Sequence, residues 1–132
     1  AYAYMGECYD QLRRLDEAVR SYRKALERES GNGEWWFKLG RLLFNPGRVS
    51  EAGKALRNAV RIGDEAEEPP YWLAEAHRSL GEILAMKNNR RAAIVHYQRF
   101  LELAPEGSID RRTVKKALKE WGIDVDAKEE MF

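Results

Sequence analysis

Residues 35–59 read WWFKLGRLLFNPGRVSEAGKALRNA. The stretch is divided at 45–47 by Asn, Pro and Gly, a combination of residues that ends helices and makes turns. The segment before the turn contains the small residue Gly40, and the segment after it contains Ala52. A small residue in each of two neighbouring helices lets the backbones approach closely, and large side chains fill the space around the crossing. The stretch therefore predicts a pair of antiparallel helices.

The same arrangement occurs three times along the chain. In each copy an alanine lies twelve residues after a glycine, and a large residue lies four residues after the alanine. The three sets are Gly6, Ala18 and Tyr22, then Gly40, Ala52 and Leu56, then Gly81, Ala93 and Tyr97. Such self-similarity indicates a stack of similar units, each of which buries its apolar face against its neighbours.

These copies resemble the tetratricopeptide repeat, whose pattern is W-x2-L-G-x2-Y, then A-x3-F, then P. The second copy carries the pattern as Trp36, Leu39, Gly40, Leu43, Ala52 and Leu56, and the third closes on Pro105. The resemblance covers residues 1 to about 105. It implies an all-α fold, an α-solenoid of antiparallel helix pairs that coil into a right-handed superhelix, with about seven helices.

The resemblance also implies the domain organisation. Repeats are expected at about 1–32, 33–66 and 70–107, and a capping helix over 109–121 completes a repeat domain that spans 1–122. The polar segment 123–132 is predicted to be a flexible tail. The chain starts without Met, and its first repeat lacks the first two positions. We therefore expect a piece of a larger protein.

Single residues at or near the helix ends support finer predictions. Asp16 and Ser50 are predicted to be the N-caps of the second helices in the first two repeats. Gly53 lies inside a predicted helix, where glycine costs about 1 kcal/mol relative to alanine, so we expect close packing to require it. Cys8 is expected to be a small buried apolar residue.

Seven extra residues separate the second and third repeats, between Gly63 and Leu73. Gly63 is predicted to end one helix, and Pro70 to lie in the first turn of the next. The next helix would then start early and carry Tyr71 and Trp72 on an extra turn. The longer connection has two interpretations, a contact with a partner or a loop in solvent.

The last predicted helix, about 109–121, has an apolar stripe of Val114, Leu118 and Trp121. The rest of its surface is rich in basic residues, namely Arg111, Arg112, Lys115, Lys116 and Lys119. A solenoid needs a polar outer face on its terminal unit, so this helix is predicted to be a cap. The basic face is also compatible with an acidic partner or a phosphate backbone.

The composition argues against nucleic-acid and membrane binding. The 23 Lys and Arg residues are balanced by 22 Asp and Glu residues, so the net charge is +1. No apolar run approaches the roughly 20 residues needed to cross a bilayer. Cys8 is the only cysteine, which is compatible with a reducing compartment and slightly favours the cytoplasm.

The sequence gives no indication of catalysis, a metal site or a cofactor. His77 and His96 lie 19 residues apart with no cysteine or histidine near either in sequence, so both are expected to be packing or surface residues. No phosphate-binding glycine loop, GxSxG or HExxH motif is present. We therefore predict that the protein is not an enzyme.

In the family that the repeat resembles, the first helices of the repeats line a concave groove that holds an extended or helical peptide. The family's groove positions select as partner-binding candidates Tyr4, Phe37, Arg41, Phe44, Asn45, Arg78 and Glu82. Phe37, Arg41 and Phe44 share one helical face, because they lie at i, i+4 and i+7. The two rings are predicted to be surplus to the core or, alternatively, to fill gaps between neighbouring helices. We expect a ligand with one or two apolar anchors beside an acidic residue.

The leading prediction is a non-catalytic protein-interaction module within a larger scaffold or assembly protein. Binding of chaperone C-terminal tails is disfavoured, because Ala3 and Glu7 stand where the family members that bind such tails have Lys and Asn. The alternatives are a structural spacer or self-association segment, and a regulatory domain of an enzyme. The first helix pair has no polar cap, so weak end-to-end self-association through Tyr2, Tyr4 and Tyr9 is predicted.

Overall fold

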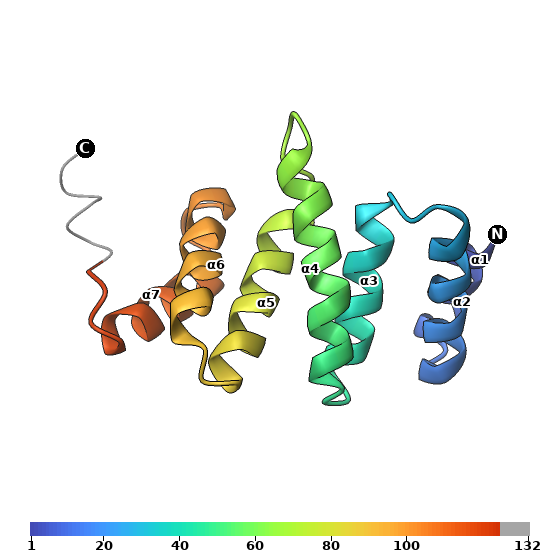
Figure 1. Cartoon of the computed structure of the whole chain (residues 1–132), viewed down its shortest axis with the longest axis horizontal. Coiled ribbons are helices and arrows are strands. Elements are labelled where there is room, and N and C mark those ends of the chain that lie inside the picture. The colour runs from blue at the N-terminus through green and yellow to red at the C-terminus, as the bar shows by residue number, and fades with distance from the viewer. Residues whose placement is uncertain (125–132) are drawn as a thin grey trace.

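The computed structural model describes residues 1–124. These residues form α-helices and no β-strand (Figure 1). The helices are α1 (Tyr2–Gln11), α2 (Leu15–Arg28), α3 (Gly33–Phe44), α4 (Val49–Glu65), α5 (Leu73–Met86), α6 (Arg90–Leu103) and α7 (Ile109–Glu120). The pairs α1–α2, α3–α4 and α5–α6 follow one another along the long axis of the molecule, and α7 lies beyond the third pair (Figure 1). The predicted all-α solenoid is therefore confirmed.

Each helix pair crosses where its glycine stands. A Cβ on Gly40 would lie 2.6 Å from Cγ of Leu56, a distance that real Cβ atoms do not show. Gly6 and Gly81 approach the rings of Tyr22 and Tyr97 in the same way, at 2.8 and 2.7 Å. The glycine of the first helix thus makes room for the large residue of the second helix. The alanines at the crossings, such as Ala52, are fully buried beside them.

The turns within the three pairs share one geometry. Arg13, Gly47 and Asn88 occupy the same position in each repeat and have left-handed backbones, with φ of 59°, 87° and 60°. The next residue then donates its N–H to a carbonyl five residues back: Arg14 to Tyr9 at 2.8 Å, Arg48 to Leu43 at 3.0 Å and Asn89 to Leu84 at 2.8 Å. This pattern is the Schellman motif, which satisfies carbonyls at a helix end.

The predicted N-caps Asp16 and Ser50 are wrong. The left-handed turn is so tight that α2 and α4 begin at Leu15 and Val49, two residues earlier than these caps would require, and their N-cap residues are Arg14 and Arg48. Asp16 and Ser50 consequently lie in the first helical turn rather than at the cap. Side-chain caps occur elsewhere: Asn32 accepts a hydrogen bond from the N–H of Trp35 at 3.2 Å, and Asn89 accepts one from Ala92 at 3.3 Å.

The connection between α4 and α5 also differs from the prediction. Gly63 does not end α4, which continues to Glu65, and α5 begins only at Leu73. Tyr71 and Trp72 therefore lie in a turn before α5 instead of on an extra helical turn. The reason is packing, since a Cβ on Gly63 would lie 2.6 Å from Cδ1 of Leu73 and 3.0 Å from the ring of Trp72. Gly63 is needed for close approach rather than for a helix end.

The expectation that close packing requires Gly53 is wrong as well. A Cβ at this position would meet nothing nearer than Cγ2 of Ile83, at 3.7 Å, which is ordinary van der Waals contact. The nearness of Gly53 to Ile83 nevertheless shows that α4 packs against α5 here, and Ile83 is only 1% exposed.

Cys8, which the sequence predicted to be buried, is half-buried in the structure.

The position of α7 continues the repeat. Val114, Leu118 and Gly122 lie 34 residues after Leu80, Leu84 and Asn88. Gly122 has a φ of 82°, and Ile123 donates to the carbonyl of Leu118 at 2.9 Å, as in the earlier turns. The glycine of the crossing, however, is replaced by Lys115. α7 is thus placed like the first helix of a further pair but lacks the small residue that a second helix would cross.

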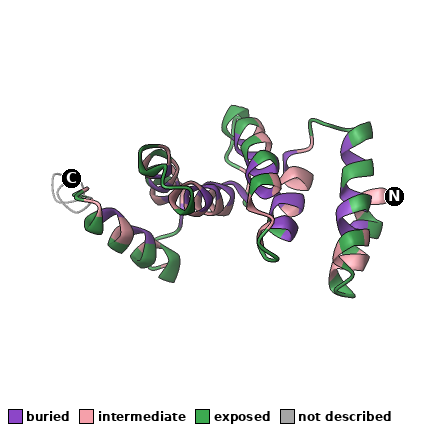
Figure 2. Ribbon diagram, turned by 60° about the horizontal axis from the view of Figure 1, so that its bottom comes forward, coloured by how far each residue is buried: buried purple, intermediate pink, exposed green. Residues whose placement is uncertain are grey.

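The buried residues form two clusters, which lie on the faces where helices meet (Figure 2). The larger cluster runs from Ala18 to Ile83, and the smaller joins α6 to α7 through Tyr97, Phe100, Ala104, Val114 and Leu118. In the smaller cluster the ring of Trp121 stacks on Tyr97 with centroids 5.8 Å apart. The predicted flexible tail begins with Ile123 and Asp124, which follow the turn after α7, and its remainder, 125–132, lies outside the described residues.

Candidate functional site

The first helices of successive pairs lie close enough for ion pairs to join them. Lys38 of α3 reaches Glu7 of α1 at 4.0 Å, and Arg78 of α5 reaches Asp110 of α7 at 3.9 Å. We call the surface shared by α1, α3, α5 and α7 the A-helix surface. The residues that the sequence predicted for partner binding belong to α1, α3 and α5, except Asn45, which directly follows α3.

Phe37 is not available on this surface, and its prediction as a ligand contact is corrected. Its side chain is 5% exposed and stacks on Trp72, with ring centroids 6.0 Å apart and planes at 19°. Phe44 is half-buried and packs against the larger core cluster. Of the two interpretations given for these rings, the structure favours the filling of gaps between neighbouring helices, because the connection before α5 brings Trp72 over Phe37.

Arg41 and Asn45 remain exposed on α3 and at its C-terminal end. The guanidinium of Arg41 lies 5.6 Å from the centroid of the Phe37 ring, a cation–π contact. Within the described residues it makes no ion pair. Its charge is therefore open to a ligand.

Arg78 and Glu82 are paired with each other, at 2.9 Å. Arg78 also donates to Glu75, with 3.0 Å between Nε and Oε2. The hydrogen bond to Glu75, followed by the charges of Glu75, Glu82 and Asp110, raises the pKa of Arg78, whereas burial lowers it. A ligand carboxylate at this point would compete with three carboxylates of the chain, so Arg78 is not an open cation as the sequence suggested.

Two cations on α7 extend the A-helix surface. Arg112 and Lys116 lie 34 residues after Arg78 and Glu82, and they stand one helical turn apart. Both are exposed, and within residues 1–124 neither makes an ion pair. The sequence-based prediction treated α7 as a separate cap and missed this continuity. The 34-residue spacing between Gly81 and Lys115, which is the length of one repeat, would have revealed that α7 continues the A-helix surface.

The opposite end of the surface is acidic. Burial and, after it, the charges of Glu7 and Asp10 on α1 together raise the pKa of Tyr22 to about 12. Tyr4, the remaining candidate, is 72% exposed, and its hydrogen bond with Cys8 raises its pKa. The A-helix surface is consequently acidic at α1, with open cations on α3 and α7.

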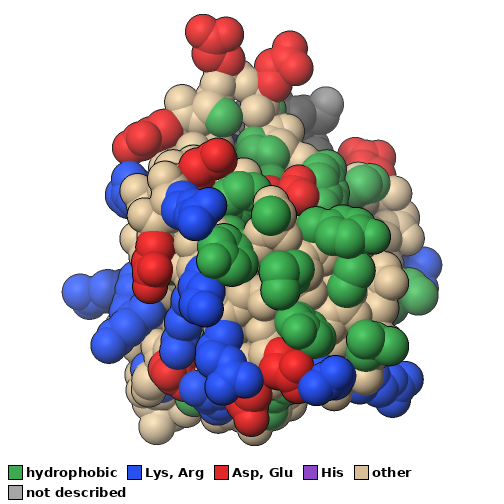
Figure 3. Space-filling model, turned by 90° about the vertical axis from the view of Figure 1, so that its right-hand side faces the viewer, with side chains coloured by type: hydrophobic (Ala, Val, Ile, Leu, Met, Phe, Trp, Pro, Cys, Tyr) green, Lys and Arg blue, Asp and Glu red, His purple; other side chains and the backbone are tan. Residues whose placement is uncertain are grey.

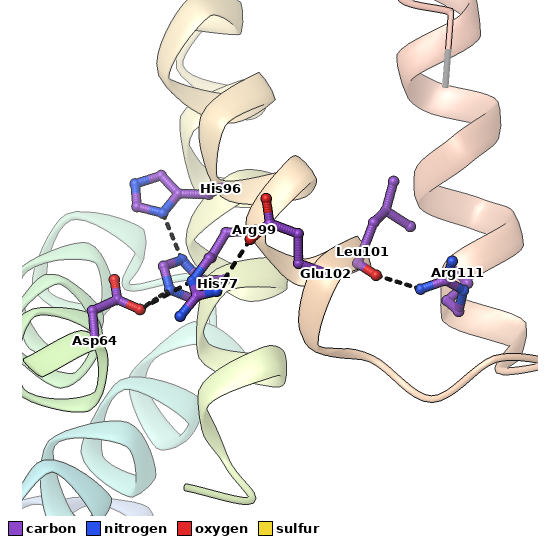
Figure 4. A network of polar contacts seen from close by, with 7 residues as sticks. All are labelled: Asp64, His77, His96, Arg99, Leu101, Glu102 and Arg111. Carbon is purple, nitrogen blue, oxygen red and sulfur yellow. Dashed lines mark hydrogen bonds and ion pairs between the residues drawn. The ribbon is translucent and has the colours of Figure 1, made fainter. Parts of the chain in front are cut away.

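His77 and His96, which the sequence predicted to be packing or surface residues, lie against each other, and His77 is buried. Their Nδ1 atoms lie 3.0 Å apart, and Nε2 of His77 lies 3.1 Å from Oδ1 of Asp64 (Figure 4). Arg99 donates to the same carboxylate oxygen at 3.3 Å. Nε2 of His77 carries a proton, which it donates to Asp64. A neutral imidazole has only one N–H, so Nδ1 of His77 must accept a hydrogen bond from Nδ1–H of His96. The network thus assigns one neutral tautomer to each ring.

The two rings belong to a polar network that joins α4, α5 and α6 through Asp64, His77, His96 and Arg99. The ring centroids are 5.2 Å apart, and the ring planes are tilted by 31°. No group of three metal-binding side chains occurs among residues 1–124. Burial lowers the pKa of both rings, and that of His96 falls to about 4. Both imidazoles are therefore neutral near pH 7.

A pocket of about 660 Å³ lies between α2, α3 and α4. Its floor is apolar and is formed by Leu26, Leu39, Leu43 and Ala55. Arg23 and Glu51 both line it and form an ion pair 3.1 Å long that joins α2 to α4. The sequence did not predict this pocket, because it arises from the spacing between two repeats.

No helix within residues 1–124 combines the length and apolar character that a membrane span requires.

A family model described as tetratricopeptide repeat matches residues 6–67. Among curated proteins, the chain is 30% identical over 105 residues to a mouse Tonsoku-like protein, covering 75% of this chain and 8% of that protein. It is 29% identical over 99 residues to the tetratricopeptide repeat-containing protein trd-1 of Caenorhabditis elegans, covering 75% of this chain and 11% of that protein. The chain thus spans only a small part of these relatives.

Solved structures have the same fold. A crystal structure of MamA protein superposes with a TM-score of 0.68 at 28% identity, covering 77% of this chain and 52% of that one. The N-terminal domain of stress-induced protein-1 from C. elegans gives a TM-score of 0.74 at 19% identity, with 90% of each chain covered. The second likeness concerns the fold alone.

Proposed function

Because this chain belongs to the tetratricopeptide repeat family, we propose that it is a non-catalytic protein-interaction module that binds an acidic peptide segment of a partner on its A-helix surface. Repeats of this kind bind proteins in general. The proposal that the ligand is acidic rests on the exposed cations Arg41, Arg112 and Lys116, which make no ion pair within the described residues.

The charge on the rest of the surface is largely compensated from within the chain. Lys38 is held by Glu34 at 3.3 Å, and Arg78 is surrounded by Glu75, Glu82 and Asp110. An acidic segment would therefore gain most at α3 and α7, where a carboxylate meets a guanidinium or ammonium that has no competing partner. Met86, 63% exposed at the end of α5, offers an apolar contact on the helix between α3 and α7.

Fluorescence anisotropy with two short labelled peptides tests this proposal. One peptide combines leucine anchors with aspartate and glutamate, and the other replaces the acidic residues with lysine. We expect the acidic peptide to bind more tightly, and added salt to weaken it. Arg41→Glu combined with Lys116→Glu should weaken binding by at least about 2 kcal/mol while the circular dichroism spectrum is unchanged.

Arg57→Glu is the matched control, because Arg57 is an exposed cation on α4, outside the A-helix surface, and makes no ion pair within the described residues. This variant should bind the acidic peptide as the wild type does. Equal binding of the two peptides, or equal loss in the control and the double variant, would contradict the proposal.

A further inference from the structure

The pocket between α2, α3 and α4 has a counterpart one repeat further along the chain, between α4, α5 and α6. Positions in α2 recur 34 residues later in α4, and positions in α3 and α4 recur 41 residues later in α5 and α6. The apolar floor of the pocket is formed by Leu26, Leu39 and Leu43, and the corresponding positions hold Val60, Leu80 and Leu84. The first groove and the second groove, as we call them, can therefore be compared residue by residue.

A ring is anchored in the same way in both grooves. In the first groove, Nε1 of Trp36 donates to the carbonyl of Ser30 at 2.8 Å, just after α2. In the second groove, His77 has the position of Trp36, and its Nε2 lies 3.1 Å from Asp64, which has the position of Ser30 (Figure 4). Each hydrogen bond ties a ring of the first helix of one pair to the end of the second helix of the pair before it.

The two grooves differ in what lies against that ring. In the second groove the imidazole of His96 on α6 lies against His77, with ring centroids 5.2 Å apart (Figure 4). The corresponding residue on α4 is Ala55, which has only a methyl group and lines the pocket. The chain thus supplies a second ring in the second groove, whereas in the first groove a pocket of about 660 Å³ lies beside Trp36. A ring that comes from outside the chain can take this place.

The rim of the pocket carries charges of both signs. Arg23 and Glu51 compensate each other across the groove at 3.1 Å. Glu27 on α2 and Lys54 on α4 also line the pocket, are exposed, and make no ion pair within residues 1–124. One wall therefore offers a carboxylate and the other an ammonium group. A ring flanked by a basic residue on one side and an acidic residue on the other is complementary to this rim.

We propose that the pocket binds an aromatic side chain of a partner protein's segment, which lies against Trp36 with a basic residue near Glu27 and an acidic residue near Lys54. A volume of about 660 Å³ exceeds that of one ring and is in the range that holds ligands of several groups, so the residues beside the ring enter with it. Arg41, Arg112 and Lys116 do not line this pocket. The site is thus separate from the one proposed for an acidic peptide, and both can be occupied together.

Fluorine NMR of the whole chain, with 5-fluorotryptophan at its four tryptophans, tests the proposal. The probe is a peptide with phenylalanine at its centre, lysine three residues before it and glutamate three residues after it. We expect the signal of Trp36, assigned with Trp36→Phe, to shift and that of Trp121 on the far side of α6 to stay. Alanine in place of the phenylalanine should weaken binding at least about tenfold. Two lysines or two glutamates should weaken it about two- to fivefold, because exposed ion pairs contribute little.

Ala55→His gives the first groove the ring that the second groove already has. It should weaken binding of the phenylalanine peptide at least about tenfold while the circular dichroism spectrum is unchanged. Gln98→His is the matched control, because it adds the same ring at an exposed position of α6 outside the pocket. Lys54→Glu tests the rim without filling the pocket: it should weaken the lysine–glutamate peptide and strengthen the peptide with two lysines.

A second apolar surface provides the control for non-specific binding. Figure 3 shows hydrophobic side chains gathered at the end of the molecule where α1 lies, and Tyr4 and Leu12 are 72% and 65% exposed. A ring that sought any apolar surface would bind there, so Tyr4→Ser combined with Leu12→Ser should leave the affinity unchanged.

The proposal is overturned if the Trp36 signal does not shift, or if the alanine peptide binds as tightly as the phenylalanine peptide. Equal loss in Ala55→His and Gln98→His overturns it, as does loss in the Tyr4 and Leu12 variant. N-acetylphenylalaninamide that binds as tightly as the peptide would indicate a small-molecule pocket and overturn the assignment to a partner segment. Arg41→Glu with Lys116→Glu should bind the phenylalanine peptide as the wild type does, so this proposal and the one for an acidic peptide fail independently.

Discussion

The indole ring of Trp72 stacks on the ring of Phe37, with centroids 6.0 Å apart and planes at 19°. Trp72 comes from the connection before α5 and is 6% exposed. Its ring lies against Gly33 at the start of α3 and Gly63 near the end of α4, where a Cβ would approach it to 2.7 and 3.0 Å. The extra residues between the second and third repeats therefore place a large side chain in the core.

Trp72→Ala should lower the free energy of unfolding by about 3–5 kcal/mol, because it leaves a cavity among Phe37, Gly33 and Gly63. Urea denaturation followed by circular dichroism measures this change. Tyr71→Ala is the neighbouring control: Tyr71 is 77% exposed, so its loss should change stability by no more than about 0.5 kcal/mol. Similar values for the two variants would contradict the core position of Trp72.

Gly53→Ala should stabilise the protein by about 1 kcal/mol. The residue lies inside α4, where alanine is favoured over glycine, and the new methyl group would make ordinary contact with Ile83. Gly63→Ala in the same helix should destabilise, because its Cβ would overlap Leu73 and Trp72. Thermal unfolding of both variants checks the signs, and a destabilised Gly53→Ala would show that the space beside Ile83 is not available.

Acidification should destabilise the fold through His77 and His96. The pKa values of both rings are lowered by burial, and that of His96 falls to about 4. The unfolded chain therefore binds protons below about pH 6.5 that the folded chain does not accept, so stability present at pH 7 is lost as the pH falls toward 4. At pH 5 the loss is on the order of 2 kcal/mol.

Urea midpoints between pH 7 and about pH 5 measure this dependence, over a range in which most ordinary carboxylates remain ionised. The double variant His77→Leu with His96→Leu should show a flatter curve over the same range. The carboxylate of Asp64 keeps its hydrogen bond from Arg99 in that variant. A wild-type curve as flat as that of the variant would contradict the histidine assignment.

Removal of α7 should expose the smaller core cluster. A chain that ends at Ala104 lacks Val114, Leu118 and Trp121, so Tyr97 and Phe100, now 6% and 3% exposed, would face solvent. We expect lower stability and increased binding of an apolar fluorescent dye. A chain that ends at Asp124 retains α7 and should behave as the whole protein does. Unchanged dye binding in the shorter chain would contradict a capping role.

The binding candidates show where sequence reasoning worked and where it stopped. The register of the repeat placed Arg41 and Asn45 at an exposed position, and the structure agrees. The same register marked Phe37 as surplus to the core, but it cannot show that Trp72, 35 residues later, covers that ring. It also marked Arg78 as a ligand contact without showing that Asp110 comes to 3.9 Å.

The sequence by itself determined the helix pairs and the turns within them. Gly6, Gly40 and Gly81 each meet a large residue 16 positions later in the same pair, and the left-handed turn lies between them, so both features depend on short segments of chain. Only the tertiary structure decided which side chains remain free for a partner. Burial and charge compensation join different pairs, as Trp72 joins Phe37 and Asp110 joins Arg78, and a repeat pattern carries no information about the neighbour that stacks on each unit.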